Sequence, residues 1–187
     1  MQQYVEKQLS MALIATDLNC SINKVVYYMN KYKIERRSIS DAVYQRNNPN
    51  GDPFCIKHIN SVEDAKLLGL GLGIYWGEGN KANKWSVRVG NTDPKLLKTF
   101  INFLVNICGV NRNDLRFSLQ VFSDIDIDEA LTYWISELEI SHSQFGKPTV
   151  TISGSIGTYR KKSLYGVVTV SYHNRKLKNL LVDMLPR

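Results

Sequence analysis

The chain has 187 residues, a formal net charge of +7 and 43% hydrophobic residues, which fits a globular protein of one medium domain or of a small and a larger one. It contains no run of about 18 apolar residues, so we expect no membrane-spanning helix. Its three cysteines are widely spaced, which argues against a disulfide framework and paired zinc ligands. The start has no secretory apolar core, so we expect a cytoplasmic protein. A basic chain most often binds a polyanion, with nucleic acid the leading candidate, and a merely basic surface is the alternative.

Residues 9–34 predict two short helices joined by a tight turn. Ser10 can cap the first helix and Ser21 the second, which should run to about Tyr32. This spacing is typical of a helix-turn-helix, and the segment resembles bacterial DNA-binding modules of that type. A plain helical hairpin that packs on its neighbour is the alternative. The expected buried stripe of the second helix is Ile22, Val25, Val26 and Met29.

The second helix of such a module enters the major groove, led by its N-terminal residues. Asparagine can read adenine there, and lysine can read guanine or hold phosphate. The basic segment that follows the helix should mostly hold the DNA backbone. The DNA-binding candidates of this module are Asn23, Lys24, Tyr27 and Lys31 on the helix, followed by Arg36 and Arg37.

Proline, glycine and asparagine between residues 47 and 53 predict turns and a domain boundary. We therefore expect a helix-turn-helix module over residues 1–40, a linker over 41–60 and a larger domain over 61–187.

The most informative run covers residues 69–79 and follows a helix-forming lead-in. A glycine inside a helix costs about 1 kcal/mol, and the four-residue spacing of Gly69, Gly73 and Gly77 puts all three on one face, where a second helix can approach closely. The run ends in Glu78 and Gly79, so a helix pair would bring two carboxylates together, and a divalent cation would relieve their repulsion. A phosphate-binding loop and a plain packing helix are the alternatives.

Residues 71–79, Gly-Leu-Gly-Ile-Tyr-Trp-Gly-Glu-Gly, resemble the LAGLIDADG motif of homing endonucleases. The small residues, the terminal acid and the closing glycine match, whereas Trp76 stands at the first acidic position of the motif. The resemblance implies that Glu78 binds a catalytic Mg²⁺ or Mn²⁺ ion and that no small-molecule cofactor is needed. It also implies a homodimer, because the chain has one motif, with the three glycines at the interface. Lys81 and Lys147 are further catalytic candidates, as basic groups that could assist at the reacting phosphate.

The remaining sequence predicts an α+β domain. Alternating residues predict strands over 85–90 and 115–122, and a pair of strands over 147–153 and 164–172. Helices are expected after Thr92 or Asp93, over about 127–138 and over about 174–185. The acids of residues 124–129 are interpreted as the first turn of a helix, since the spacing of a calcium loop is missing. The resemblance implies an antiparallel saddle-shaped sheet, in which the helix at 127–138 would be an insertion.

The polar faces of these strands carry arginine and hydroxyl side chains and almost no acid. One polar and one buried face is ordinary for an antiparallel sheet, but a face without acids beside a basic hairpin suits DNA, as the resemblance implies. The DNA-binding candidates of this domain are Arg88, Arg116, Gln120, Arg160, Lys161 and Lys162.

These observations predict sequence-specific binding of double-stranded DNA with metal-dependent phosphodiester hydrolysis, in a prokaryotic nucleoid-associated, phage or mobile-element protein. The rival is a non-catalytic DNA-binding regulator built on a similar domain, and a structural subunit of a mobile-element or phage complex is a third class. Glu78 favours the nuclease, and Trp76 mildly favours the regulator.

Overall fold

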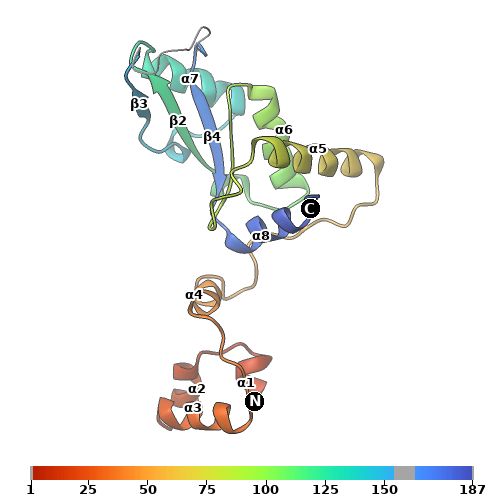
Figure 1. Cartoon of the computed structure of the whole chain (residues 1–187), viewed down its shortest axis with the longest axis vertical. Helices are drawn as coiled ribbons and strands as arrows, with labels where there is room; N and C mark the ends of the chain where they lie inside the picture. Colours follow the sequence, from red (N-terminus) through yellow and green to blue (C-terminus); the bar gives the residue numbers. More distant parts are fainter. Residues whose placement is uncertain (1, 154–162, 187) are drawn as a thin grey trace. The chain divides into compact units, whose positions relative to one another are not determined.

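The computed structural model describes residues 2–153 and 163–186 and divides the chain into two compact units, Met1–Asp52 and Pro53–Arg187 (Figure 1). Unit 1 is helical, and unit 2 combines helices with one sheet. No helix in the described part of the chain is long and apolar enough to cross a membrane.

Unit 1 contains α1 (Gln2–Val5), α2 (Met11–Asp17), α3 (Ile22–Lys31) and α4 (Ile39–Asn47). Both predicted caps are confirmed: the Ser10 hydroxyl accepts from the Leu13 amide at 3.1 Å and the Ser21 hydroxyl from the Lys24 amide at 3.3 Å. The prediction that Ile22 is buried is wrong, since this first residue of α3 is 48% exposed. The sequence did not predict α1. The small core of the unit consists of Tyr4, Ile14, Ala15, Val25 and Met29.

The expected linker over residues 41–60 is divided between the two units. Helix α4 lies in its first part, and the Ser38 hydroxyl caps this helix by accepting from the Asp41 amide at 3.1 Å. The last part belongs to unit 2, because the Cys55 amide donates to the Cys108 carbonyl at 3.0 Å and residues 54, 56 and 59 pack against the core of that unit. The boundary between the units therefore falls after Asp52.

Unit 2 begins with α5 (Val62–Glu78), β1 (Val87–Asn91), α6 (Pro94–Asn106), the 3-10 turn η1 (Arg112–Asp114) and β2 (Arg116–Phe122). It continues with α7 (Ile127–Leu138), the 3-10 turn η2 (His142–Gln144), β3 (Thr149–Thr151), β4 (Val167–Tyr172) and α8 (Arg175–Asp183). Asp93 caps α6, and Asp126 caps α7 by accepting from two amides of its first turn. The α+β class is thus confirmed, and the acids near residue 126 begin a helix, as predicted.

The sheet has the strand order β1-β4-β2-β3. Strand β4 is antiparallel to both β1 and β2, whereas β3 is parallel to β2. The prediction of an entirely antiparallel sheet is therefore wrong, and so is the predicted pairing of residues 147–153 with 164–172. The physical reason is α7, which carries the chain from the end of β2 back to its start, and a strand that returns through such a crossover pairs in parallel.

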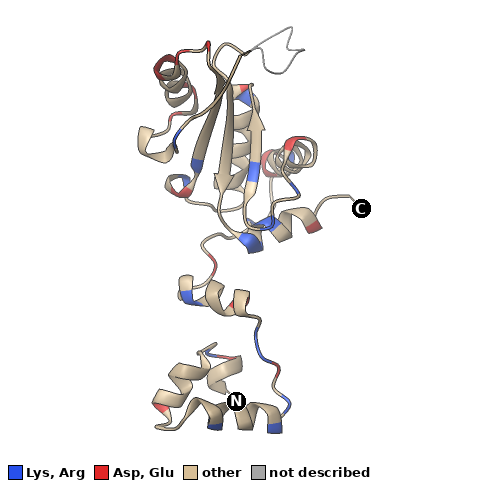
Figure 2. Ribbon diagram, turned by 60° about the vertical axis from the view of Figure 1, so that its left-hand side comes forward, with Lys and Arg blue, Asp and Glu red and all other residues tan. Residues whose placement is uncertain are grey.

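One face of the sheet is buried and the other is polar, as predicted. Alternate residues of β1 and β2 are buried, among them Val89 and Leu119. In β4 the last three residues, Val170, Ser171 and Tyr172, are all buried, so Ser171 is a buried residue of the polar face. Helices α5 and α6 contact β1, α6 also contacts α7, and these helices lie on one side of the strands (Figure 1). The opposite face carries the arginine and hydroxyl side chains of the strands. No helix layer in the described part of the chain covers this face (Figure 2).

Candidate nucleic-acid interface

Helix α5 has two faces with different roles for glycine. A Cβ atom added to Gly71 would lie 2.0 Å from Cγ of Phe103 on α6, so this glycine permits the close packing of α5 on α6. The same addition at Gly69, Gly73 or Gly77 would meet no atom within 4 Å. The three glycines expected at a dimer interface therefore have no packing partner among the described residues.

Exposed apolar side chains flank these open glycines. Val62, Leu70 and Trp76 belong to the same helix, and Trp76 is 57% exposed. At 100° per residue, Val62 and Trp76 project within about 40° of the direction shared by Gly69 and Gly73. The outer face of α5 therefore combines open glycines with exposed apolar side chains, and it also carries the exposed Lys66.

Glu78 is the last residue of α5 and is exposed. Its carboxylate forms no hydrogen bond or ion pair with any described residue. The chain continues directly into the sheet, since Gly79 pairs with Val89 and the Asn80 amide donates to the Arg88 carbonyl at 3.0 Å. The carboxylate thus lies at the C-terminal end of α5, next to the edge strand β1.

The basic candidates for catalysis are separated. The Lys81 ammonium donates to the Trp76 carbonyl, which keeps Lys81 at the end of α5 near Glu78. Lys147 directly precedes β3, at the other edge of the sheet, because β4 and β2 lie between β1 and β3. At about 4.8 Å per strand, the three spacings between β1 and β3 place the two edges roughly 14 Å apart. Within one chain, Lys147 and Glu78 therefore lie near opposite edges of the sheet.

Among the described residues, no group of three or more His, Cys, Asp or Glu side chains could hold a metal ion. A single chain offers one carboxylate at this place, which is too few ligands for Mg²⁺ or Mn²⁺. Two copies of Glu78 brought together by α5 would supply two carboxylate ligands, and water and phosphate oxygens could complete the shell. The residues fit a divalent cation only as a site shared by two chains.

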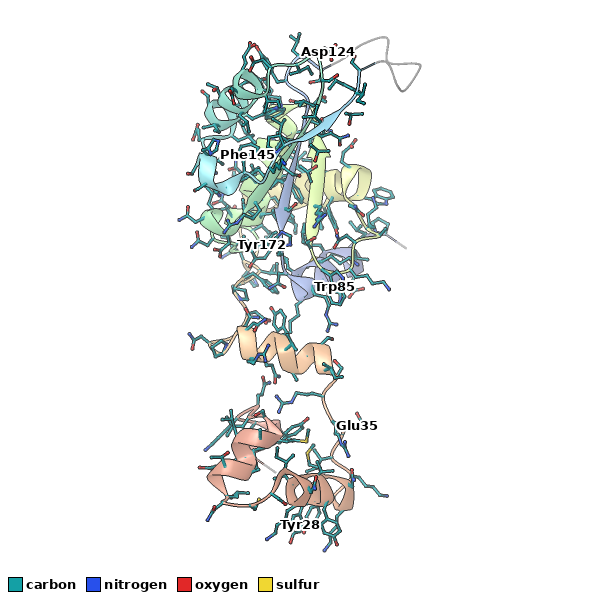
Figure 3. All side chains as sticks on the ribbon, turned by 90° about the vertical axis from the view of Figure 1, so that its left-hand side faces the viewer. Tyr28, Glu35, Trp85, Asp124, Phe145 and Tyr172 are labelled. Atoms are coloured by element: carbon teal, nitrogen blue, oxygen red, sulfur yellow. The ribbon has the colours of Figure 1, made fainter. Side chains whose placement is uncertain are left out.

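The outward side of α3 carries the candidates predicted to read bases (Figure 3 labels the neighbouring Tyr28). Asn23, Lys24, Tyr27 and Lys31 are all exposed. Tyr28 packs edge-to-face on Tyr27, with ring centres 5.4 Å apart, and stacks on Tyr32 at 6.3 Å. These contacts hold the three tyrosine rings together along α3 and its C-cap. The sequence analysis did not predict these ring contacts.

Arg37 has a structural role that the sequence did not reveal. Its guanidinium donates to the carbonyls of Tyr4, Gln8 and Leu9 at 2.7–3.0 Å and to the side chain of Gln45. The guanidinium carbon also lies 4.1 Å from the centre of the Tyr4 ring. An arginine with these contacts ties α1 and α4 to the rest of unit 1, so both terminal nitrogens of Arg37 are already engaged within the unit. Arg36 has one contact, to the Asn30 side chain at 3.3 Å, and remains exposed.

The polar face of the sheet brings together candidates from three strands. Ser171 on β4 pairs with Arg88 on β1 and with Arg116 on β2, so the two arginines flank this serine on one face. The next row of that face contains Gly90, Thr169 and Ser118, and Gln120 on β2 donates to the Thr151 hydroxyl at 3.4 Å. The candidates Arg160, Lys161 and Lys162 lie outside the described residues.

Two residues of this face escaped the sequence analysis. Ser86, fully buried, accepts from Nε of Arg88 at 2.8 Å and donates to the Asn83 side chain at 3.1 Å. His173 follows Ser171 by two positions, and the alternation of β4 could have placed it on the polar face. Partial burial, together with Arg88 and Arg116, holds the pKa of His173 below its ordinary 6.5.

Comparison of the chain with protein-family models, with curated proteins and with solved structures found no match.

Proposed function

We propose that this protein binds double-stranded DNA as a homodimer joined through α5 and hydrolyses phosphodiester bonds at a site formed by two copies of Glu78. The observation that carries the proposal is the outer face of α5, which is lined by Gly69, Gly73 and Gly77 and has no packing partner among the described residues, on a helix whose last residue is the exposed Glu78. Each of these glycines lowers helix stability by about 1 kcal/mol relative to alanine. Close packing of a second helix on this face would offset that loss.

The likeness to the LAGLIDADG motif agrees with this arrangement at the level of single residues. Gly79 is closely surrounded, because an added Cβ would lie 2.3 Å from the Tyr75 carbonyl, so the closing glycine of the motif is sterically required here. Gly71 stands where the motif begins with leucine, and the ring of Phe103 occupies the space that a larger side chain would need. The departure at this position thus has a local packing reason.

Phosphodiester hydrolysis would take place at the C-terminal end of α5, and DNA binding would use the sheet face and α3. A bound Mg²⁺ or Mn²⁺ ion would supply Lewis acidity and an activated water. The paired Glu78 carboxylates would hold the ion, and Lys81, fixed at the end of α5, would contribute positive charge near the phosphate. The polar face of the sheet would carry the DNA that presents this phosphate, and α3 would read bases elsewhere on the duplex.

A non-catalytic DNA-binding regulator is the second candidate. One specific observation favours it: Trp76, at the first acidic position of the motif, is exposed on the dimerisation face, so a chain contributes only one carboxylate there. In that case α5 would still join two chains, and both DNA-contacting surfaces would keep their roles.

The test is selection of a duplex from a random library, followed by incubation of the selected DNA with Mg²⁺ or Mn²⁺. The nuclease predicts metal-dependent cutting that falls by several orders of magnitude in Glu78→Gln, while DNA binding persists. Glu63→Gln is the matched control, because it changes an exposed glutamate of the first turn of the same helix.

Wild-type binding without cutting would select the regulator. Equal cutting by wild type and Glu78→Gln would place the active site elsewhere. A failure to bind any duplex at about 50 mM salt would reject both candidates.

A further inference from the structure

Positively charged side chains surround Ser171 on the polar sheet face, near the C-terminal end of β4. Arg88 and Arg116 both pair with Ser171, on opposite sides of β4, and paired Cα atoms in antiparallel strands lie about 5 Å apart. Arg88 and Arg116 are therefore about 10 Å apart at Cα. His173 lies two residues further along the same face. Figure 2 shows β1 and β2 on either side of β4, each with a blue segment and neither with a red one.

No carboxylate balances this charge. Neither arginine nor His173 forms an ion pair with a described acid. The strands β1, β2 and β4 contain no Asp or Glu. The charged groups that act on His173 are Arg88 from β1 and Arg116 from β2, and Arg175 and Lys176 of α8 follow it in the chain. Like charges held together without a counter-ion are destabilising, so the arrangement is complete only when an anion binds.

The guanidinium of Arg88 is held in place before any ligand arrives. Its Nε donates to Ser86, which is fully buried, and Ser86 is held in turn by Asn83. The two terminal nitrogens of Arg88 form no hydrogen bond with a described residue. Arg116 uses Nη1 for the carbonyls of Asn113 and Leu115, which leaves Nη2 and Nε for a ligand. Both arginines thus keep donor nitrogens that have no hydrogen-bond partner among the described residues.

We propose that Arg88, Arg116 and His173, arranged around Ser171, form a clamp for one backbone phosphate of the bound DNA. This phosphate clamp rests on the DNA binding proposed above and divides the sheet face into two functions. Arginine and protonated histidine offer only donors, which match the acceptor oxygens of a phosphate. A guanine edge also accepts, but it carries no charge to offset the two arginines. The amide and hydroxyl groups of Gln120, Thr149 and Thr151 both donate and accept, so the other end of the face suits base edges.

The first test compares DNA binding by the full chain and its variants as a function of salt. Arg116→Gln and Arg88→Gln should each weaken binding to every duplex alike, by roughly tenfold, and should reduce the log–log salt slope by about one. Lys95→Gln is the control, because it removes one exposed charge on α6, in the helix layer on the other side of the sheet. Altered sequence preference with an unchanged slope in the arginine variants would overturn the clamp in favour of base contacts.

The second test uses inorganic phosphate as the probe and the imidazole proton resonances of His173 in the full chain as the readout. Phosphate should raise the pKa of His173 in the wild type and in Lys95→Gln, and should leave it unchanged in Arg88→Gln and Arg116→Gln. Because binding raises this pKa, DNA affinity should increase as the pH falls from the pKa of His173 in the complex toward its lower pKa in the free protein. His173→Gln should remove that increase.

The outcomes separate the clamp from the proposed function. If DNA binds but phosphate leaves the His173 pKa unchanged, and the arginine variants bind as the wild type does, the clamp is wrong and the DNA-binding proposal stands. If phosphate raises the pKa while no duplex binds at low salt, the anion site is real and the DNA-binding proposal fails.

Discussion

Alanine substitutions at Gly71 and Gly73 of α5 should have opposite effects on the stability of the monomer, and Gly73 also provides the sharpest test of the proposed dimer. Alanine at Gly73 adds a Cβ that meets no atom within 4 Å, so the monomer should gain about 1 kcal/mol of stability from helix propensity. Alanine at Gly71 places its Cβ 2.0 Å from Cγ of Phe103. Because Phe103 is fully buried, it cannot move away freely, and we expect a loss of about 1–3 kcal/mol through overpacking.

In the dimer, we expect a larger side chain at position 73 to weaken association, although it stabilises the monomer. In a close helix pair the same alanine would separate the two copies of α5, and Gly73→Leu should abolish the dimer while leaving unit 2 folded. Sedimentation equilibrium measures the association, and denaturant unfolding at several protein concentrations measures its link to stability. The wild type should gain stability as its concentration rises, and Gly73→Leu should not. An unchanged dimer dissociation constant in Gly73→Leu would refute the interface, and a loss of stability in the dilute Gly73→Ala monomer would refute the open helix face.

The remaining predictions concern binding and stability. Asn23→Ala should reduce sequence discrimination by about 1–3 kcal/mol, whereas Arg36→Ala should weaken all duplexes alike. Competition between the selected and a scrambled duplex measures both, and full discrimination by Asn23→Ala would contradict the assignment of α3. Tyr75 is fully buried and its hydroxyl has no hydrogen-bond partner among the described residues, so Tyr75→Phe should raise the free energy of unfolding by about 1 kcal/mol. Decreased stability in denaturant titration would indicate a partner for that hydroxyl in solution. In the free protein, burial and flanking arginines hold the pKa of His173 below 6.5, so the unfolded state takes up more protons and stability should fall as the pH drops below that value. His173→Gln should flatten this part of the stability profile.

Local rules were sufficient for most helix and strand positions. Ser10, Ser21 and Asp93 cap helices where their hydroxyl and carboxylate groups predicted it. The alternation of residues 115–122 predicted a strand with one buried face, and the acids before Ile127 predicted the start of a helix. These features depend on hydrogen bonds and periodicities within a few residues, so they can be recognised in the chain itself.

The partners of these elements were decided only by tertiary structure. The pairing of β3 with β2 depends on where α7 leads the chain, and the separation of Lys147 from Glu78 follows from that strand order. The role of Arg37 depends on carbonyl groups that lie about 30 residues away in sequence.

The glycines of α5 show most clearly which properties are local to the sequence and which depend on tertiary structure. Their spacing in the sequence predicted a close approach by another helix. The packing of unit 2 uses Gly71 for the intramolecular contact with Phe103 and leaves Gly69, Gly73 and Gly77 open. Which face of a helix is buried depends on contacts with residues distant in sequence, whereas helix formation and the spacing of small residues are local properties.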